Sequence, residues 1–253
     1  MVDIIINGCG GKMGKVVAEI AKNDGDVNIV AGVDPFVTEN KDFPVFTSFE
    51  ECNVKADAVV DFSTATAVPA LLDYCEKTGT ACIVCTTGLS QDTLNRIEAL
   101  SQKIPVFKSA NMSLGVNLLA RILKKYAYAL YEAGFDVEIV ERHHNQKADA
   151  PSGTALMLAD AVNESVENKL NYIYDRSPVR EKRDRNQLGI SAVRGGTIVG
   201  DHEVIFAGRD EVVEFKHSAY SKEVFAVGAI KAAKFIKDKP AGKYDMQDVT
   251  DEV

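Results

Sequence analysis

The chain has 253 residues, 46% of them hydrophobic and 26% charged, and its net charge is −8. This composition is typical of a globular protein with one large or two modest domains. The acidic balance excludes a broad basic face, so neither nucleic acid nor an anionic membrane is an expected partner, whereas a small anionic substrate is compatible with it.

The sequence predicts neither a membrane-spanning helix, nor a signal peptide, nor a metal site. It contains no run of about 18 apolar residues, so no membrane-spanning helix is expected. The first strand is expected to begin at residue 2 or 3, which leaves no room for a signal peptide, so we expect a cytoplasmic protein. An odd number of cysteines then favours free thiols. The pair Cys82 and Cys85 lies in an apolar run, and this pattern favours small buried side chains over metal or redox roles.

Residues 3–111 alternate between apolar runs and helical spacing. Such runs, when continuous, indicate parallel strands that are buried on both faces. With helices between them, they predict a doubly wound, Rossmann-like sheet. The expected strands are 3–7, 28–34, 56–62, 81–88 with its turn, and 104–111, and the expected helices are 15–23, 67–79 and 90–103.

The pattern changes after Asn111. A long helix is expected over 114–134, followed by a strand over 135–142 in which apolar residues alternate with polar ones. Alternation indicates half-buried strands of an antiparallel or mixed sheet. Strands at 188–196, 201–208 and 211–219 and a helix at 155–162 complete an α+β domain with a mixed, mostly open sheet. The last helix, 224–239, can return to the first domain, and the charged segment 176–187 is expected to be a solvated connection.

Four glycines, Gly8, Gly10, Gly11 and Gly14, lie between the first strand and the first helix. They fit a G-x-x-G-x-x-G spacing, which lets a backbone turn tightly and present helix N–H groups to a pyrophosphate. Asp34 ends the second strand, where a carboxylate can accept from a ribose 2′-OH. The alternative is a tight turn without a ligand. Small polar segments after three strands, 61–64, 86–88 and 109–113, favour a nucleotide cleft at their carboxyl ends.

The segment ERHHNQKADAPSGTALML, residues 141–158, contains two of the four histidines. Neighbouring strand residues point to opposite faces, so both histidines serve one pocket only if the strand ends there. Ser152 or Thr154 is the expected N-cap of the next helix, whose N-terminus would bind carboxylates. An imidazole beside such a site is a suitable proton donor. The alternative is a surface loop with a helix cap.

This segment resembles the signature E-x-H-H-x-x-K-x-D-x-P-S-G-T-A of the dihydrodipicolinate reductase family. GCGGKMG, SANMSLGVN and VRGGTIVGDHEVIFAG are similar to further segments of that family, so the resemblance covers most of the chain. It implies hydride transfer from NADH or NADPH to a small cyclic dicarboxylate, 4-hydroxy-tetrahydrodipicolinate, in the diaminopimelate and lysine pathway. It also implies a homotetramer assembled through the second domain. The predicted domains are 1–113 with 223–253 for the dinucleotide, and 114–222 for substrate binding and oligomerisation.

The resemblance implies the roles of particular residues. His143 matches the proton donor, and Lys147 matches a second catalytic residue. The substrate carboxylates are expected at His144, Ser152, Gly153 and Thr154. The cofactor positions are Gly8, Cys9, Gly10, Gly11, Lys12, Met13, Asp34, Cys85, Thr86, Thr87, Ser109, Ala110, Asn111 and Met112.

Two departures from the family pattern bear on the cofactor. Cys85 stands where the family has glycine, so its β-carbon either crowds the nicotinamide or is accommodated by the backbone. Asp34 is followed by Pro35 and Phe36 in place of an arginine. Since a carboxylate repels a 2′-phosphate, we expect NADH to serve at least as well as NADPH, with Lys12 able to offset the repulsion.

Two other classes of protein fit the sequence less well. A semialdehyde dehydrogenase needs a nucleophilic cysteine in mid-chain, and no cysteine follows Cys85. A nucleotide-sensing regulator needs a DNA-binding module, which the acidic charge opposes.

Overall fold

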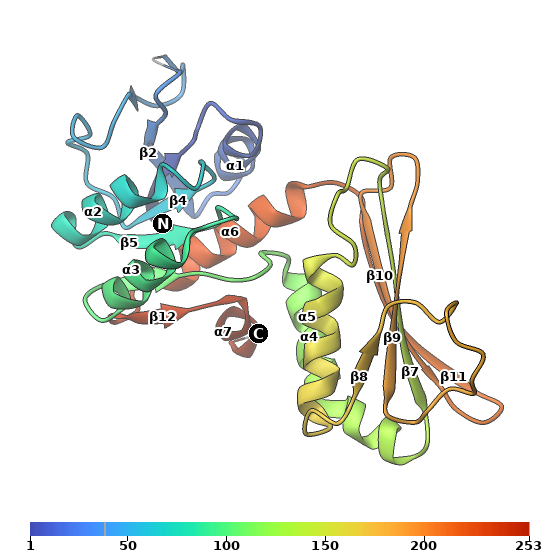
Figure 1. The fold of residues 1–253 in the computed structure, drawn as a ribbon. Helices are drawn as coiled ribbons and strands as arrows, with labels where there is room; N and C mark the ends of the chain where they lie inside the picture. Colours follow the sequence, from blue (N-terminus) through green and yellow to red (C-terminus); the bar gives the residue numbers. More distant parts are fainter. Residues whose placement is uncertain (38, 253) are drawn as a thin grey trace. The chain divides into compact units, whose positions relative to one another are not determined.

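The computed structural model of the chain describes residues 1–37 and 39–252. It divides into two compact units, Met1–Ser113 with Glu223–Val253, and Leu114–Lys222 (Figure 1). We describe each unit by itself. Within the described ranges, no helix is long and apolar enough to cross a membrane.

The first unit contains a seven-stranded sheet in the order β12-β6-β5-β4-β1-β2-β3, and every strand pair in it is parallel. Its strands are β1 (Val2–Asn7), β2 (Val27–Val33), β3 (Val45–Phe46), β4 (Ala58–Asp61), β5 (Ala81–Val84), β6 (Pro105–Phe107) and β12 (Gly242–Tyr244). Its helices are α1 (Lys12–Lys22), α2 (Val68–Thr78), α3 (Gln91–Ser101), α6 (Glu223–Ile236) and α7 (Met246–Asp251). This arrangement confirms the predicted Rossmann-like sheet.

The core of this unit follows from the apolar runs. Every residue of β4 and β5 is buried, because helices cover both faces of the sheet. Helices α2 and α3 pack together, and so do α1 and α6. The strand order reverses between β1 and β4, and right-handed crossovers place helices on opposite faces there. The carboxyl ends of β1, β2 and β4 therefore meet at this reversal, where ligands bind in such sheets.

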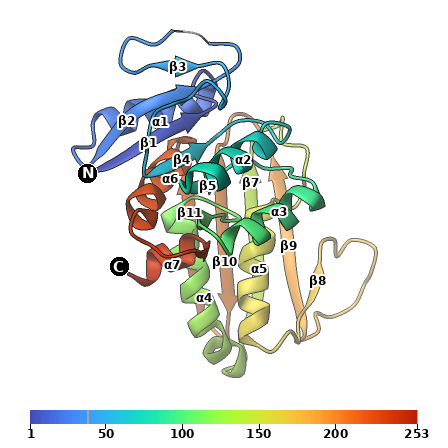
Figure 2. The same cartoon turned by 90° about the vertical axis from the view of Figure 1, so that its left-hand side faces the viewer.

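The second unit contains a five-stranded sheet in the order β11-β10-β7-β9-β8. Its strands are β7 (Asp136–His143), β8 (Asn171–Ile173), β9 (Gln187–Arg194), β10 (Gly200–Ala207) and β11 (Val212–Ala219), and its helices are α4 (Leu114–Glu132) and α5 (Gly153–Ser165). Strand β7 pairs antiparallel with β10 and parallel with β9, which confirms the predicted mixed sheet. Both helices pack on one face of it, as Figures 1 and 2 show.

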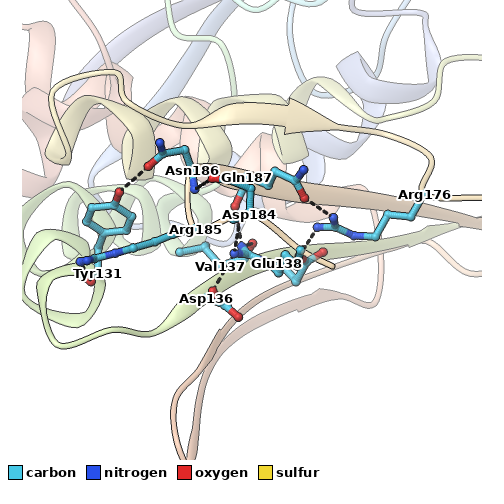
Figure 3. Close-up of polar contacts among 10 residues, drawn as sticks. Tyr131, Asp136, Val137, Glu138, Arg176, Asp184, Arg185, Asn186 and Gln187 are labelled. Carbon is cyan, nitrogen blue, oxygen red and sulfur yellow. Dashed lines mark hydrogen bonds and ion pairs between the residues drawn. The ribbon is translucent and has the colours of Figure 1, made fainter. Parts of the chain in front are cut away.

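The segment 176–187 makes side-chain contacts that its charged sequence did not predict. It is largely exposed, as expected, but its side chains reach back to α4 and β7 (Figure 3). Arg183 Nη1 donates to Asp136 at 2.6 Å, and Arg176 Nη2 donates to Glu138 at 2.5 Å. Tyr131 Oη donates to the side chain of Asn186 at 2.9 Å. The predicted solvated connection is therefore confirmed in its exposure, whereas its side-chain contacts were not predicted, because the partners are distant in sequence.

Candidate active site

The glycine loop of the first unit has the geometry of an anion cradle. Gly8 has a φ of +79°, and a β-carbon there would lie 2.8 Å from the carbonyl oxygen of Phe62. A β-carbon at Gly14 would lie only 2.1 Å from the oxygen of Gly8. Gly11 is the N-cap of α1 and has no side-chain capping bond, so the first N–H groups of the helix are not capped by that residue. Glycine at these positions therefore lets backbone approach backbone and leaves donors for a phosphate.

A pocket of about 410 Å³ opens beside this loop. It brings together four predicted cofactor residues, namely Gly8, Gly10, Gly11 and Asp34. Sequence reasoning did not assign the rest of its lining, although the polar segment after β4 indicated part of it. These additional residues are Asn7, Pro35, Phe36, Val37, Phe62, Ser63, Thr64 and Ala67. The segments 85–87 and 109–112 are outside the lining that the described residues give this pocket.

Asp34 is buried and connects the end of β2 to the glycine loop. Its Oδ2 accepts from the backbone N–H of Gly10 at 3.0 Å, and its Oδ1 accepts from that of Phe36 at 2.9 Å. Each carboxylate oxygen can accept a second hydrogen bond, so a ribose hydroxyl still finds an acceptor here. A tight cradle and a carboxylate at the second strand end fit a dinucleotide.

The other residues of the loop segment contribute differently. The Cys9 side chain packs against Gly32 and Phe43 in the core, and burial together with the charge of Asp34 raises the pKa of its thiol to about 11. Only the backbone of Cys9 is therefore suited to a ligand. Lys12 and Met13 form the first turn of α1, where Lys12 is exposed and Met13 half-buried.

Lys108 links the two polar segments that follow β5 and β6. Its Nζ donates to the carbonyl oxygen of Thr86 at 3.1 Å. Burial lowers the pKa of this ammonium, against the opposing influence of Cys85 and Asp61. Burial also raises the pKa of the Cys85 thiol, and the Asp61 carboxylate adds to the effect. The Cys85 side chain is thus half-buried and lies within the electrostatic influence of Lys108 and Asp61.

The predicted cofactor segment 109–112 is held by its own polar groups. Ser109 Oγ donates to the carbonyl oxygen of Asn111 at 2.9 Å. Ser109 and Met112 are buried, whereas Ala110 is exposed. Of the segment after β5, Thr86 is buried and Thr87 is exposed. Backbone groups and the exposed side chains are therefore the ones that a ligand can reach.

In the second unit, strand β7 ends at His143, which meets the condition for both histidines to serve one pocket. Alternation along β7 places Glu141 and His143 on the same, buried face. Nδ1 of His143 lies 2.7 Å from Oε2 of Glu141. A β-carbon on Gly200 would lie 3.0 Å from Nε2, so the absence of a side chain there gives the ring its space.

Glu141 is fully buried, yet it is ionised by its partners. Burial alone would raise its pKa, but hydrogen bonds from Arg194, His143 and the Ser152 backbone hold the pKa of this carboxyl below its usual value. Arg194 donates to both carboxylate oxygens at 2.7 Å. A bidentate guanidinium contact of this kind is strong and geometrically specific.

The N-terminus of α5 lies beside this group. Ser152 is the N-cap, and its Oγ accepts from the backbone N–H of Ala155 at 3.1 Å, which decides between the two predicted caps. The same oxygen lies 2.8 Å from Nε2 of His202. His202 is buried, and desolvation together with the charge of His143 lowers its pKa to about 4. Sequence reasoning assigned no role to His202 or Arg194, although both lie in the segment VRGGTIVGDHEVIFAG that resembles the family.

The remaining predicted residues of this unit lie around the same helix end. His144 is half-buried and follows the last residue of β7, and its carbonyl oxygen accepts from the Lys147 backbone N–H at 3.2 Å. Lys147 Nζ pairs with Asp149 at 2.8 Å. Gly153 is exposed and Thr154 half-buried in the first turn of α5. A cation, an imidazole and a helix N-terminus are groups that bind carboxylates.

Solved structures share this fold. A dipicolinate-bound dihydrodipicolinate reductase from Paenisporosarcina sp. TG-14 superposes with a TM-score of 0.80 at 23% identity, covering 97% of each chain. An amine dehydrogenase from Mycobacterium smegmatis gives a TM-score of 0.61 at 10% identity, covering 97% of this chain and 95% of the other. At these identities the likeness concerns the fold.

Sequence comparisons identify the family. Residues 2–112 match the model for the N-terminus of dihydrodipicolinate reductase, and residues 115–250 match the model for its C-terminus. The 4-hydroxy-tetrahydrodipicolinate reductase of Clostridium tetani is 51% identical, covering 97% of this chain and 96% of its own. That of Caldanaerobacter subterraneus subsp. tengcongensis is also 51% identical, covering 98% of both. The chain therefore belongs to the dihydrodipicolinate reductase family of oxidoreductases.

Proposed function

We propose that the chain reduces 4-hydroxy-tetrahydrodipicolinate to tetrahydrodipicolinate with NADH or NADPH, a step of diaminopimelate and lysine biosynthesis. The observation that carries this is His143, whose Nδ1 is held by a buried carboxylate beside the N-terminus of α5. Family membership and the names of the curated relatives support the reaction. The dipicolinate-bound neighbour supports a cyclic dicarboxylate as the substrate class.

The substrate carboxylates would be held at the start of α5. Ser152, Gly153 and Thr154 lie at its N-terminus, where the helix dipole favours anions. His144 and the Lys147 ammonium follow β7 in the same stretch of chain and add donors. Since Lys147 is paired with Asp149 at 2.8 Å, a substrate carboxylate would have to replace or share this contact.

A bound nicotinamide dinucleotide would supply the hydride. The glycine loop would hold its pyrophosphate, and Asp34 would accept from the ribose 2′-OH. Because Asp34 would repel a 2′-phosphate and no arginine follows it, NADH should serve at least as well as NADPH. Measuring kcat/KM with both cofactors tests this, and a value at least about tenfold higher for NADPH would contradict it.

After hydride addition the substrate carries an electron-rich centre that must be protonated. His143 would donate this proton from Nε2, because Nδ1 faces the Glu141 carboxylate. Lys147 would either assist or hold substrate charge. In this proposal the residues that transfer the proton lie in the second unit. The glycine loop and Asp34, which would bind the cofactor, lie in the first unit.

Steady-state kinetics of three variants test these roles. The assay follows absorbance at 340 nm with substrate supplied by the coupled upstream synthase. His143→Gln should lower kcat by about 10²–10⁴ and leave NADH affinity nearly unchanged. Lys147→Ala should lower kcat and, if the ammonium grips substrate, also raise KM, whereas His144→Ala should raise KM more than it lowers kcat. If His143→Gln kept more than about a tenth of kcat with chemistry rate-limiting, His143 would not be the donor.

We also propose a cytoplasmic homotetramer that assembles through the sheet of the second unit. Helices α4 and α5 cover one face of this sheet. The strands also carry exposed apolar side chains, including Val193 at 44% and Val212 at 56% exposure. Analytical ultracentrifugation tests the proposal, and a monomer at micromolar concentration would contradict it.

A further inference from the structure

Both oxygens of the buried Glu141 carboxylate, next to His143, are already hydrogen-bonded within the protein. Its Oε2 contacts His143 Nδ1 and Arg194 Nη1, each at 2.7 Å. Its Oε1 accepts from Arg194 Nη2 at 2.7 Å and from the Ser152 backbone N–H at 2.9 Å. The β7–β9 register places Arg194 directly opposite His143, so the sheet itself assembles the trio of Glu141, His143 and Arg194.

These contacts decide which ring nitrogen of His143 handles protons. An ionised carboxylate only accepts hydrogen bonds, so Nδ1 carries a proton and donates it to Glu141. The proton that comes and goes is then the one on Nε2, which lies next to Gly200. A hydrogen bond to one ring nitrogen commonly fixes the role of the other.

We propose that Glu141 and Arg194 are a positioning pair for His143, in which Glu141 orients the ring and stabilises its protonated form while Arg194 offsets the carboxylate charge so that the ring still releases its proton. This inference rests on the proposed role of His143 as the donor. It assigns functions to two residues that act on the proposed reaction through His143.

The charges explain why both members are needed. Without Arg194, an uncompensated carboxylate at 2.7 Å would hold the proton on the ring too firmly. Without Glu141, the guanidinium would repel the protonated ring. The other titratable or charged groups around this site are His202 on β10, with its ring centroid 5.1 Å from that of His143, His217 opposite it on β11, and the Lys147–Asp149 ion pair in the loop after β7.

The test is the pH dependence of kcat in the full chain, for Glu141→Gln, Arg194→Gln and the double variant. A general acid loses activity as pH rises, so the alkaline midpoint of kcat is the readout. Glu141→Gln should lower kcat at least about tenfold and move this midpoint down by about one pH unit. Arg194→Gln should move it up by about one unit. The double variant should fall between them, and NADH affinity should stay within about twofold of wild type throughout.

A matched control is available on the same strand. Arg142, one residue from Glu141, points to the opposite face of β7 and pairs with Glu203 at 3.0 Å. Arg142→Gln and Glu203→Gln remove charges of the same types and should leave the alkaline midpoint unchanged. If Arg194→Gln does not fold, the midpoints of Glu141→Gln and the double variant decide the question, because the double variant buries no unpaired charge.

Two outcomes separate this inference from the proposed function. If His143→Gln retains the alkaline limb of wild type, the donor assignment fails, and this inference fails with it. If His143→Gln abolishes the limb but Glu141→Gln and Arg194→Gln move it in the same direction or not at all, the donor assignment stands and the positioning pair is refuted. A general loss of packing would not move the alkaline midpoint up in one variant and down in the other. Opposite shifts of the midpoint therefore identify an effect of charge.

Discussion

The two units each bury one carboxylate completely near the end of a strand, and they satisfy it differently. In the second unit, both oxygens of Glu141 have two partners each. In the first unit, Oδ1 of Asp61 accepts from Asn7 Nδ2 at 2.8 Å and from Ser63 Oγ at 2.5 Å. Its Oδ2 is buried and has no hydrogen-bond partner among the described residues.

This difference separates the Glu141 carboxylate, whose two oxygens are both hydrogen-bonded, from the Asp61 carboxylate, which has one oxygen without a partner among the described residues. The Glu141 carboxylate is fully hydrogen-bonded, although Arg194 Nε and His202 Nδ1 beside it are buried without a partner among the described residues. Asp61 lies at the carboxyl end of β4, next to the strand-order reversal where ligands bind. The Thr86 hydroxyl, after β5, is likewise buried without a partner in the part of the chain that the structure describes. The contrast thus concerns the two carboxylates: both oxygens of Glu141 have partners, whereas Asp61 keeps an oxygen without one among the described residues.

The largest stability effect should come from breaking the hydrogen-bond network around Glu141 at one member. Arg194→Gln leaves the buried carboxylate without its main counter-charge, which typically costs about 3–5 kcal/mol. The double variant with Glu141→Gln removes both charges and should recover most of this loss. Urea titration followed by circular dichroism measures the free energy of unfolding. A loss below about 1 kcal/mol in Arg194→Gln would show that water replaces the guanidinium easily.

A second effect of the same network is pH-dependent stability. The pKa of His202 is lowered from 6.5 to about 4, so the unfolded chain binds this proton first as pH falls. The contribution of neutral His202 to the free energy of unfolding is therefore fully present above pH 6.5 and is lost as pH falls toward 4. The loss between pH 7 and pH 5 is about 2 kcal/mol. His202→Gln should remove most of this loss. Urea titrations of wild type and variant at both pH values measure it.

Local sequence predicted the features that depend on local sequence. The apolar runs around Ile5, Val59 and Ile83 gave the parallel strands, because strands buried on both faces need no polar positions. The glycine spacing predicted the loop, and the predicted strand 135–142 agrees with β7 to within one residue at each end. Edge strands β3, β8 and β12, of two or three residues, carried too little pattern to be recognised.

The groups that sequence reasoning missed depend on strand register. Arg194 lies 53 residues from Glu141, and only the β7–β9 pairing brings the two side chains together. His202 reaches Ser152 through the β7–β10 pairing in the same way. In the segment 176–187, the charge of Arg183 indicated solvent, but its partners lie on β7 and were not visible locally. Register between distant strands is a tertiary property, and a single sequence encodes it only weakly.

The smallest change in the free energy of unfolding should come from substituting Asp61, whose Oδ2 has no hydrogen-bond partner among the described residues. Asp61→Asn keeps an oxygen to accept from Asn7 and Ser63, and it exchanges an unpaired oxygen for an unpaired amide. We therefore expect the free energy of unfolding without cofactor to change by less than about 1 kcal/mol. The same isosteric change at Glu141 places an amide against donors from Arg194 or His143, and should cost at least about 2 kcal/mol. Parallel urea titrations of the two variants measure the contrast. Equal costs would mean that Asp61 Oδ2 has a partner in solution, for which the Lys108 ammonium has the right charge, and both carboxylates would then be fully hydrogen-bonded.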